Sequence, residues 1–218
     1  IERLATLAER GEALDRVILN AAVVASESRT TSAGLDVMFH VNFLAVVDLV
    51  EQLLARGLVR AATRAPARIV VVSSEAHRSG KPALDRFSEP ERYGTSGSLA
   101  HYGRSKLYLT SYAWALASTL DPNEIGVFTL CPGAVATDLA REAPRWMRVL
   151  LDPAMKRLFQ DPLVAAEPVA WLSCARELDG QTQRYYHMHT RKQPAAWVTA
   201  AGNAELVRTR ACELLETL

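Results

Sequence analysis

Neither sign of charge dominates this sequence. It has 25 lysines and arginines against 24 aspartates and glutamates, a formal net charge of +1. A balance this close to neutral gives no support for a nucleic-acid partner or for a charged membrane surface, so we expect neither. With 49% hydrophobic residues, the 218-residue chain is long enough to bury one full core.

Cysteines are few and do not form a metal-binding pattern. Cys131, Cys174 and Cys212 are odd in number and have no spacing typical of metal ligands. Such thiols are typical of a reducing compartment, and we expect a cytoplasmic protein. His187 and His189 lie two residues apart with no further ligand cluster nearby, so we expect them on a strand or loop and predict no metal site.

Long apolar runs are also missing. No uninterrupted apolar run is long enough to cross a bilayer, because Asp48 and Glu51 interrupt the best one, so we expect no membrane segment in this chain. No signal peptide is visible either. The chain opens with Ile1 and not with methionine, and we expect further residues to precede it.

Short apolar runs alternate with longer helical ones along the chain. Buried strands are predicted at residues 17–19, 69–72 and 127–130, the second directly after a basic loop at 64–68. Helical spacing is present from residue 34, from 102 to about 120, from 162 to 176 and in the tail. The alternation predicts an α/β fold, a Rossmann-like doubly wound parallel sheet with helices on both faces, in a single domain over residues 1–218.

Two long connections carry functional expectations. Residues 75–100 are polar and irregular, and long loops in compact domains are usually functional. Residues 138–162 are rich in Leu, Met, Trp and Phe among basic residues, which indicates either a substrate-side lid or an exposed helix packed on the body of the domain. We predict the lid.

Tyr102 and Lys106 are four residues apart at the start of an apolar-periodic run. On a helix this spacing places both side chains on one face, one turn apart. A fixed cation favours the ionised form of a neighbouring phenol, so the pair is a candidate proton donor and acceptor. The same spacing also occurs on ordinary helix surfaces, where it has no catalytic meaning.

Polar side chains at three other places could join this pair. Ser74 follows a predicted strand, where ligands of open α/β sheets gather, although serine also ends strands without a function. Asn42 lies inside a predicted helix, where asparagine is unfavourable, so it either faces solvent or has a function. Small residues at Asn20-Ala21-Ala22 would let a ligand approach the backbone, or simply form a turn. His77 and His101 could contact substrate or lie at the surface.

Taken in order, Asn42, Ser74, Tyr102 and Lys106 resemble the catalytic tetrad of the short-chain dehydrogenase/reductase family. The stretch Pro132-Gly133-x3-Thr137 resembles the nicotinamide loop of that family, and residues 20–22 resemble its Asn-Ala-Gly motif. The resemblance covers nearly the whole chain. Within the family, the run at 65–77, the long loop before Tyr102 and the tyrosines at 185–186 are most similar to the retinol-dehydrogenase-related branch.

This resemblance implies an NAD(P)-dependent oxidoreductase that interconverts an alcohol and a carbonyl on a small apolar substrate. Tyr102 would move the proton, and Ser74 would bind the substrate oxygen. Lys106 would lower the pKa of Tyr102 and hold the nicotinamide ribose, and the backbone carbonyl of Asn42 would anchor a water. The implied cofactor contacts are Asn20, Ala21, Ala22, Tyr102, Lys106, Pro132, Gly133, Val135 and Thr137. The cofactor would be NADP or NAD, with NADP favoured by the branch, and a homodimer would form through the Asn42 and Tyr102 helices.

The sequence departs from the family in two places. Leu19 and Ala22 stand where the family usually has asparagine and glycine. The strand, glycine-rich turn and helix that bind the pyrophosphate at the start of the family domain have no counterpart here. We therefore expect a Rossmann domain that is incomplete at the N-terminus, with the residue that selects NAD or NADP, and any membrane anchor, upstream of Ile1.

Two other functions stay open at this point. A non-catalytic or truncated interaction module is favoured by the absent glycine-rich segment and disfavoured by the intact tetrad. A nucleotide-sugar epimerase or dehydratase would share the Tyr-x3-Lys pair. Those relatives usually have a larger C-terminal substrate domain, for which this chain has little room.

Overall fold

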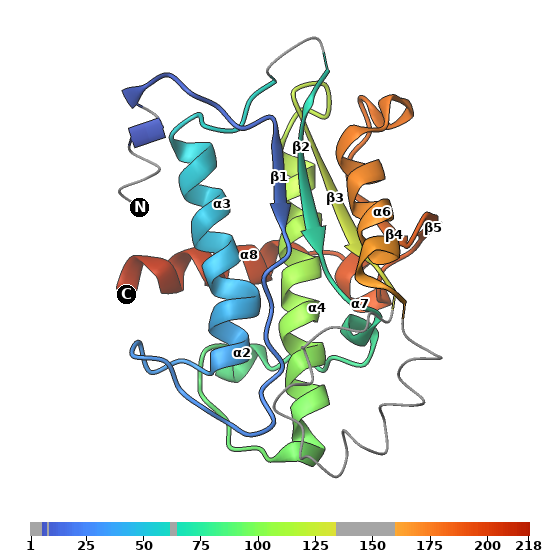
Figure 1. The fold of residues 1–218 in the computed structure, drawn as a ribbon. Helices are drawn as coiled ribbons and strands as arrows, with labels where there is room; N and C mark the ends of the chain where they lie inside the picture. Colours follow the sequence, from blue (N-terminus) through green and yellow to red (C-terminus); the bar gives the residue numbers. More distant parts are fainter. Residues whose placement is uncertain (1–5, 8, 62–64, 134–159) are drawn as a thin grey trace.

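The structure is a computed structural model, and it describes residues 6–7, 9–61, 65–133 and 160–218. Five strands form one sheet in the order β1-β2-β3-β4-β5 (Figure 1). The first four are parallel and the last is antiparallel to its neighbour. The predicted α/β class is confirmed. The strands are β1 (Arg16–Leu19), β2 (Ala67–Val72), β3 (Ile125–Cys131), β4 (Arg184–His187) and β5 (Thr190–Lys192).

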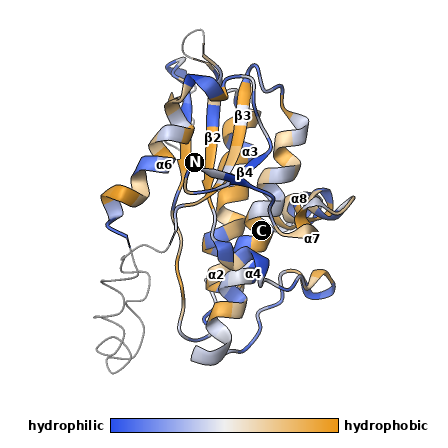
Figure 2. Ribbon diagram, turned by 90° about the vertical axis from the view of Figure 1, so that its right-hand side faces the viewer, coloured by the Kyte–Doolittle hydropathy of each residue, from blue (hydrophilic) through white to orange (hydrophobic). Residues whose placement is uncertain are grey.

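Helices cover both faces of the sheet. The helices α3 (Ala45–Ala55) and α4 (Thr95–Thr119) lie on one face, and α6 (Pro162–Cys174) lies on the other (Figure 2). Alternate residues of β2 therefore enter two separate cores: Ile69 packs with the α3 and α4 side, and Val70 packs with Leu172 of α6. Burial on both faces explains why β2 has an unbroken apolar sequence.

Shorter helices and one long C-terminal helix complete the fold. α8 packs against α4 and α3: Val207 is buried, and Arg208 pairs with Glu51 of α3, with an Nε–Oε1 distance of 3.0 Å (Figure 1). The chain thus covers part of the two helices at which a homodimer was expected, and the homodimer stays a prediction. The remaining elements are α2 (Val37–Phe39), η1 (His40–Leu44), η2 (Glu75–Arg78), η3 (Leu84–Arg86), η5 (Arg176–Leu178), α7 (Ala196–Thr199) and α8 (Asn203–Thr217).

The elements α2, η1 and α3 form one continuous helix over Val37–Ala55. It starts later than the predicted residue 34 because the Asp36 carboxylate caps it, accepting from the backbone N–H groups of Met38 and Phe39. By length and composition this helix could cross a membrane, contrary to the expectation from the sequence. Core helices of soluble proteins pass the same test, and Leu44, Val47 and Val50 are fully buried here.

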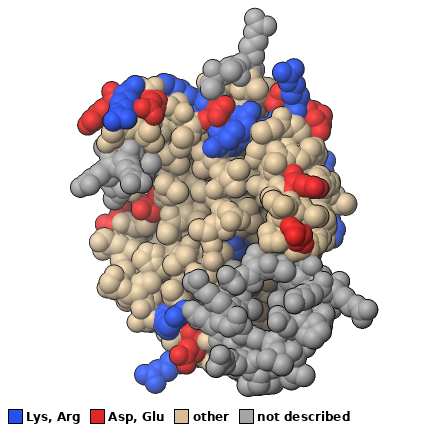
Figure 3. All heavy atoms as spheres, in the orientation of Figure 1, with Lys and Arg blue, Asp and Glu red and all other residues tan. Residues whose placement is uncertain are grey.

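β1 is less buried than the sequence predicted. Ile18 is 47% exposed, whereas Val17 and Leu19, on the opposite face of β1, are buried. Within the described residues β1 has a neighbouring strand on one side only. On the face of the molecule that carries β1, charged side chains of both signs gather along the upper border and few lie in the middle (Figure 3). The described residues show no single-sign patch on that face.

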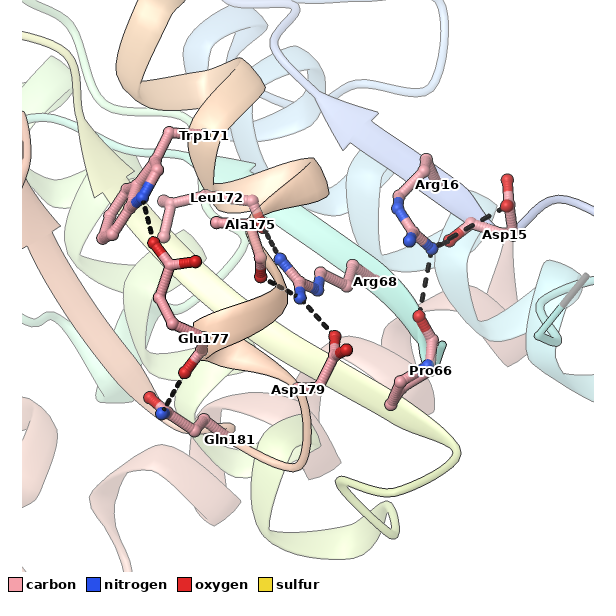
Figure 4. Close-up of polar contacts among 10 residues, drawn as sticks. All are labelled: Asp15, Arg16, Pro66, Arg68, Trp171, Leu172, Ala175, Glu177, Asp179 and Gln181. Carbon is pink, nitrogen blue, oxygen red and sulfur yellow. Dashed lines mark hydrogen bonds and ion pairs between the residues drawn. The ribbon is translucent and has the colours of Figure 1, made fainter. Parts of the chain in front are cut away.

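A buried arginine joins the sheet to α6 near the start of β2 (Figure 4). Arg68 donates from Nη1 to the Leu172 carbonyl at 2.8 Å, and from Nη2 to the Ala175 carbonyl and to Asp179 at 2.5 Å. The two carbonyls belong to the last turn of α6, where unpaired acceptors and the negative helix end favour a cation. The prediction of a basic loop at 64–68 was wrong for Arg68, which lies in β2 and is 1% exposed.

The predicted long loop at 75–100 is also shorter than expected. It contains η2 and η3, and α4 begins at Thr95, before the tyrosine of the Tyr-x3-Lys pair. Its first residues pack against α4, so they form a fixed surface beside that helix.

Candidate active site

The strand ends bring together three of the sequence-predicted segments. β1, β2 and β3 are parallel neighbours whose last residues lie in register, Leu19 opposite Val71 and Val72 opposite Leu130. Residues 20–22, 73–74 and 132–133 therefore follow the same edge of the sheet, where ligands of open α/β sheets bind. The predicted contacts Val135 and Thr137, and most of the predicted lid at 138–162, lie outside the described residues.

Tyr102 and Lys106 face this edge from α4. Tyr102 is 8% exposed and Lys106 is 1% exposed. The Nζ of Lys106 donates to the carbonyl of Val72 at 2.9 Å and lies 5.9 Å from the centre of the Tyr102 ring. The helical spacing thus places both side chains on one face, as predicted, and that face points at the end of β2.

The protonation of this pair differs from what the spacing implied. Burial raises the pKa of Tyr102 above its ordinary value, and the Ser74 side chain partly opposes the rise. Burial also lowers the pKa of Lys106 to about 8. The expected lowering of the Tyr102 pKa by Lys106 is not seen, because desolvation of both groups favours their neutral forms. The phenol therefore carries its proton at neutral pH.

Ser74 is held in an extended conformation at the start of η2. Its Oγ accepts from the backbone N–H of Ala76 at 3.2 Å, and its hydroxyl also has a hydrogen that it can donate. Its carbonyl accepts from the backbone N–H of His77 at 3.0 Å and contacts His77 Nδ1 at 2.6 Å. The Ser74 side chain lies close enough to the Tyr102 phenol to influence its pKa.

Two glycines set the distance between Tyr102 and Ser74. A Cβ on Gly103, the residue after Tyr102, would lie 2.8 Å from the carbonyl oxygen of Ala76, and a Cβ on Gly80 would lie 2.4 Å from the carbonyl oxygen of Gly103. α4 can approach the η2 turn this closely only because both side chains are absent. The sequence analysis missed Gly103, although a glycine inside a helix is a signal of close packing.

Asn42 has a positioning role that explains its place inside a helix. Its Oδ1 accepts from the Val23 N–H at 2.8 Å, and its Nδ2 donates to the Val23 carbonyl at 2.9 Å and to Ser105 Oγ at 3.1 Å. Ser105 Oγ donates in turn to the carbonyl of Tyr102 at 2.8 Å. Asn42 therefore joins the segment after β1 to the helix turn that carries Tyr102. It lies in the π-helical stretch η1, and such stretches are frequent at functional sites.

The histidines near the site are not at the surface. His77 is fully buried beneath Ser74, and His101 is mostly buried, with its ring stacked on Tyr93 at 4.0 Å between centroids. The segment of the chain that the structure describes contains no group of three His, Cys, Asp or Glu side chains that could hold a metal.

The segment after β3 is shaped around Gly133. Its φ of +89° lies in the left-handed region, which favours glycine. A Cβ there would lie 3.0 Å from Gln160 Nε2. The Oε1 of the same Gln160 side chain is buried and has no hydrogen-bond partner among the described residues. An unsatisfied acceptor therefore lies beside the predicted nicotinamide loop.

The chain was compared with known proteins. No family model matches it. It is 33% identical to mouse retinol dehydrogenase 14 over 175 residues, 79% of this chain and 50% of the relative, and 31% identical to human retinol dehydrogenase 13 over 199 residues, 89% of this chain and 58% of the relative. The chain spans about half the length of the curated relatives it matches.

Solved structures agree with these sequence relatives. A 3-oxoacyl-[acyl-carrier protein] reductase from Brucella melitensis is 26% identical, with a TM-score of 0.55 over 84% of this chain and 68% of that chain. From sequence and structure together, this chain belongs to the short-chain dehydrogenase/reductase family, near its retinol-dehydrogenase-related branch.

Proposed function

We propose that this protein is an NAD(P)-dependent oxidoreductase that interconverts an alcohol and a carbonyl, with Tyr102 as the acid/base. One observation carries the proposal: the hydroxyls of Tyr102 and Ser74 are neighbours beside the buried ammonium of Lys106, at the carboxyl edge of the sheet. The names of the sequence relatives, which are retinol dehydrogenases, support the same reaction class.

Each side chain then has one step to perform. The Ser74 hydroxyl donates to the substrate oxygen and fixes it near Tyr102. Tyr102 holds its proton at neutral pH, which is the form needed to donate that proton to a carbonyl oxygen as it becomes an alcohol. Lys106 places a positive charge near the phenol, and this stabilises the phenolate that remains after the transfer.

The residues present fit the nicotinamide end of the cofactor. The Lys106 ammonium has three donors and uses one on Val72, the single acceptor found for it in the described part of the chain, so two remain for ribose hydroxyls. The backbone of Gly133 and residues 20–22 lies at the same edge, and the Oε1 of Gln160 can accept from an amide. When bound, the cofactor supplies or takes the hydride. The sequence has no glycine-rich turn for the pyrophosphate, and NADP over NAD remains our proposal from the branch resemblance.

The substrate that we propose is a small apolar alcohol or carbonyl compound. The Leu, Met, Trp and Phe content of residues 138–162 supports an apolar substrate-side lid. The reductases and dehydrogenases among the relatives support a small-molecule substrate. A cytoplasmic location is kept as a proposal that rests on the cysteine content alone.

A Tyr102→Phe variant tests the mechanism. Nucleotide binding is measured first by fluorescence titration with NADH and NADPH. Turnover is then measured with a panel of aldehydes and ketones that includes retinal. We expect Tyr102→Phe to lower kcat at least about 100-fold with little change in nucleotide affinity, since general acid catalysis contributes roughly 100- to 10,000-fold.

Tyr112→Phe is the matched control. It removes a buried hydroxyl from the same helix, one that donates to Glu51 and lies away from the strand ends. Its turnover should stay within about twofold of wild type, because that hydroxyl has no part in the proposed proton transfer. Full turnover by Tyr102→Phe would contradict the mechanism, and a protein that binds neither nucleotide would favour a non-catalytic interaction module.

A further inference from the structure

His77 is not one of the four tetrad residues. Its ring contacts Ser74, and both ring nitrogens have a hydrogen-bond partner. Its ring is fully buried. Nδ1 lies 2.6 Å from the carbonyl oxygen of Ser74, and the backbone N–H of Ala195 donates to Nε2 at 3.0 Å. A side chain of η2 thereby connects the strand end that carries Ser74 to a residue 118 positions away in the chain.

These two partners fix the protonation state of the ring. A backbone N–H can only donate, so Nε2 must be the unprotonated acceptor, and a carbonyl oxygen can only accept, so Nδ1 must carry the hydrogen. The imidazole is therefore neutral and in a single tautomer. Burial lowers its pKa below the ordinary value, nearby Arg78 acts in the same direction, and the Ser74 carbonyl and Glu75 oppose the shift.

The neighbours of His77 reinforce the same connection. Its ring lies 4.8 Å from the ring of Tyr185, whose hydroxyl donates to Glu75 Oε1 at 2.6 Å. Arg78 donates to Glu75 Oε2 at 2.9 Å and to the Gln193 carbonyl at 2.6 Å. Three of the four residues that follow Ser74 are thus tied to β4 or to the segment after β5.

We propose that His77 is a positioning residue for the reaction, whose neutral imidazole holds the Ser74 carbonyl and thereby the direction of the Ser74 hydroxyl. The inference rests on the proposed function, because it assigns the support of a side chain that the reaction uses. Apart from its bond with the Ala76 N–H, the Ser74 hydroxyl is placed by the serine backbone and by one rotation about Cα–Cβ. A carbonyl held by both the N–H and the Nδ1–H of His77 fixes that backbone.

Three substitutions separate the two hydrogen bonds of the ring. His77→Asn places an amide near the position of Nδ1 and can still donate to Ser74, but it does not reach Ala195. His77→Gln extends further and can still accept from Ala195, but it loses the bond to Ser74. His77→Leu loses both bonds while keeping the site apolar and filled.

We expect the kcat of His77→Asn to stay within about threefold of wild type. The kcat of His77→Gln and of His77→Leu should fall by about 10- to 100-fold. The KM for nucleotide should be unchanged in all three variants. The magnitude follows from the cost of misplacing a positioned group by a fraction of an ångström. Thermal unfolding of each variant is measured in parallel. A merely structural role would lower the midpoints together and leave the kcat of the folded fraction equal among the variants, which would overturn the proposal.

The second readout needs no turnover. A long-range proton–nitrogen correlation spectrum of wild type at pH 7 reports the tautomer of each histidine, with His77→Asn used to assign the signal. We expect the Nδ1–H tautomer, and a charged ring or an Nε2–H tautomer would overturn the inference even if His77→Leu does not fold.

Ser74→Ala and Tyr102→Phe are assayed alongside. They distinguish a failure of the proposed function from a failure of the role proposed for His77. If both of these variants keep turnover, the proposed function fails and His77 has no reaction to support. If both lose turnover while His77→Leu and His77→Gln keep it, the proposed function stands and only the role of His77 is wrong.

Discussion

Two buried cations, Arg68 and Lys106, are tied to β2, one near each end of the strand. Both are 1% exposed. Arg68, near the start, donates to two carbonyls and one carboxylate, which together use most of the guanidinium. Lys106, at the end, has a single carbonyl partner among the described residues, and burial lowers its pKa to about 8. Among the described residues, the fold thus gives one cation three hydrogen-bond acceptors and the other only one.

The difference separates a structural cation from one that is available to a ligand. A buried charge is costly unless hydrogen bonds and an opposite charge compensate it. Arg68 has both, and its partners close the last turn of α6. Within the described residues, Lys106 keeps two unused donors at the edge where substrate and cofactor are proposed to bind. The desolvation of its ammonium therefore lowers the stability of the folded chain until a ligand supplies acceptors.

Replacing Arg68 by methionine should cause the largest loss of stability. Two carbonyls at the end of α6 would lose their buried donor, and we expect the free energy of unfolding to fall by about 3 kcal/mol. Urea denaturation followed by circular dichroism measures this. Arg16→Met is the matched control, since Arg16 lies opposite Arg68 in the sheet register and is more exposed, and it should cost less than about 1 kcal/mol. Equal losses would mean that the contacts of Arg68 with α6 add no stability beyond that of the more exposed Arg16.

Replacing Lys106 by methionine should have the opposite effect on stability. Below about pH 8 the folded chain must hold a charged, desolvated ammonium, and the shift from 10.5 to about 8 corresponds to roughly 3 kcal/mol, less about 1 for the lost hydrogen bond. We expect a gain of about 2 kcal/mol at pH 7 together with loss of turnover.

The pH dependence gives the sign of this effect. As the pH rises from about 8 towards 10.5, the folded state of wild type loses its proton before the unfolded state does, so wild-type stability rises relative to Lys106→Met and the gain disappears. Lys81→Met, at an exposed lysine, is the control for replacing a lysine by methionine. A Lys106→Met protein that is less stable than wild type at pH 7 would show that the ammonium is already compensated.

Adding one methyl group at Gly103 should change the spacing between η2 and α4, the helix that carries Lys106. The new Cβ meets the Ala76 carbonyl, so α4 and η2 must move apart. We expect a net loss of about 1 kcal/mol, since overpacking outweighs the helix propensity gained by alanine. A fall in kcat should accompany it, with the kinetics and the melting curve as readouts. Gly94→Ala, where nothing lies within 4 Å of the added atom, is the control for kcat and should leave it unchanged. A fully active Gly103→Ala would show that the spacing is not critical.

Removing the charge of Asp179 should have the smallest effect. The carboxylate is about one-third exposed and can rehydrate, and Arg68 would keep its two carbonyl partners. Asp179→Asn should cost less than about 1 kcal/mol, and the loss should shrink at high salt. A salt-independent loss as large as that of Arg68→Met would show that the carboxylate, and not the two carbonyls, mainly compensates the charge of Arg68.

Features with local causes were predictable from the sequence. β-branched residues identified β2, and the four-residue spacing of Tyr102 and Lys106 placed both side chains on one face of α4. The alternation of strands and helices gave the α/β class. Each of these depends on residues within a few positions of one another.

Features with distant causes were not predictable. Arg68 looked like part of a basic loop because its partners lie more than 100 positions away, in and after α6. His77 could not be placed for the same reason, since one of the two hydrogen bonds of its ring comes from Ala195. The pKa of Tyr102 was expected in the wrong direction because spacing reveals a neighbouring charge and not the loss of water around it. The assignments of Val135 and Thr137 to the cofactor site stay predictions.

The contacts of His77 and Glu75 with β4 and the segment after β5 also affect how the site is built during synthesis. β1, β2, β3 and α4 precede residue 132 and can associate while the rest of the chain is still being made. The turn after Ser74 gains its contacts with β4 and the segment after β5 only when Tyr185 and Ala195 have left the ribosome. A ribosome-bound chain that stops before β4 would therefore have Tyr102 and Lys106 on a formed helix, but the turn after Ser74 would lack its contacts with Tyr185 and Ala195, and the proposed site would be completed only after residue 195 has emerged.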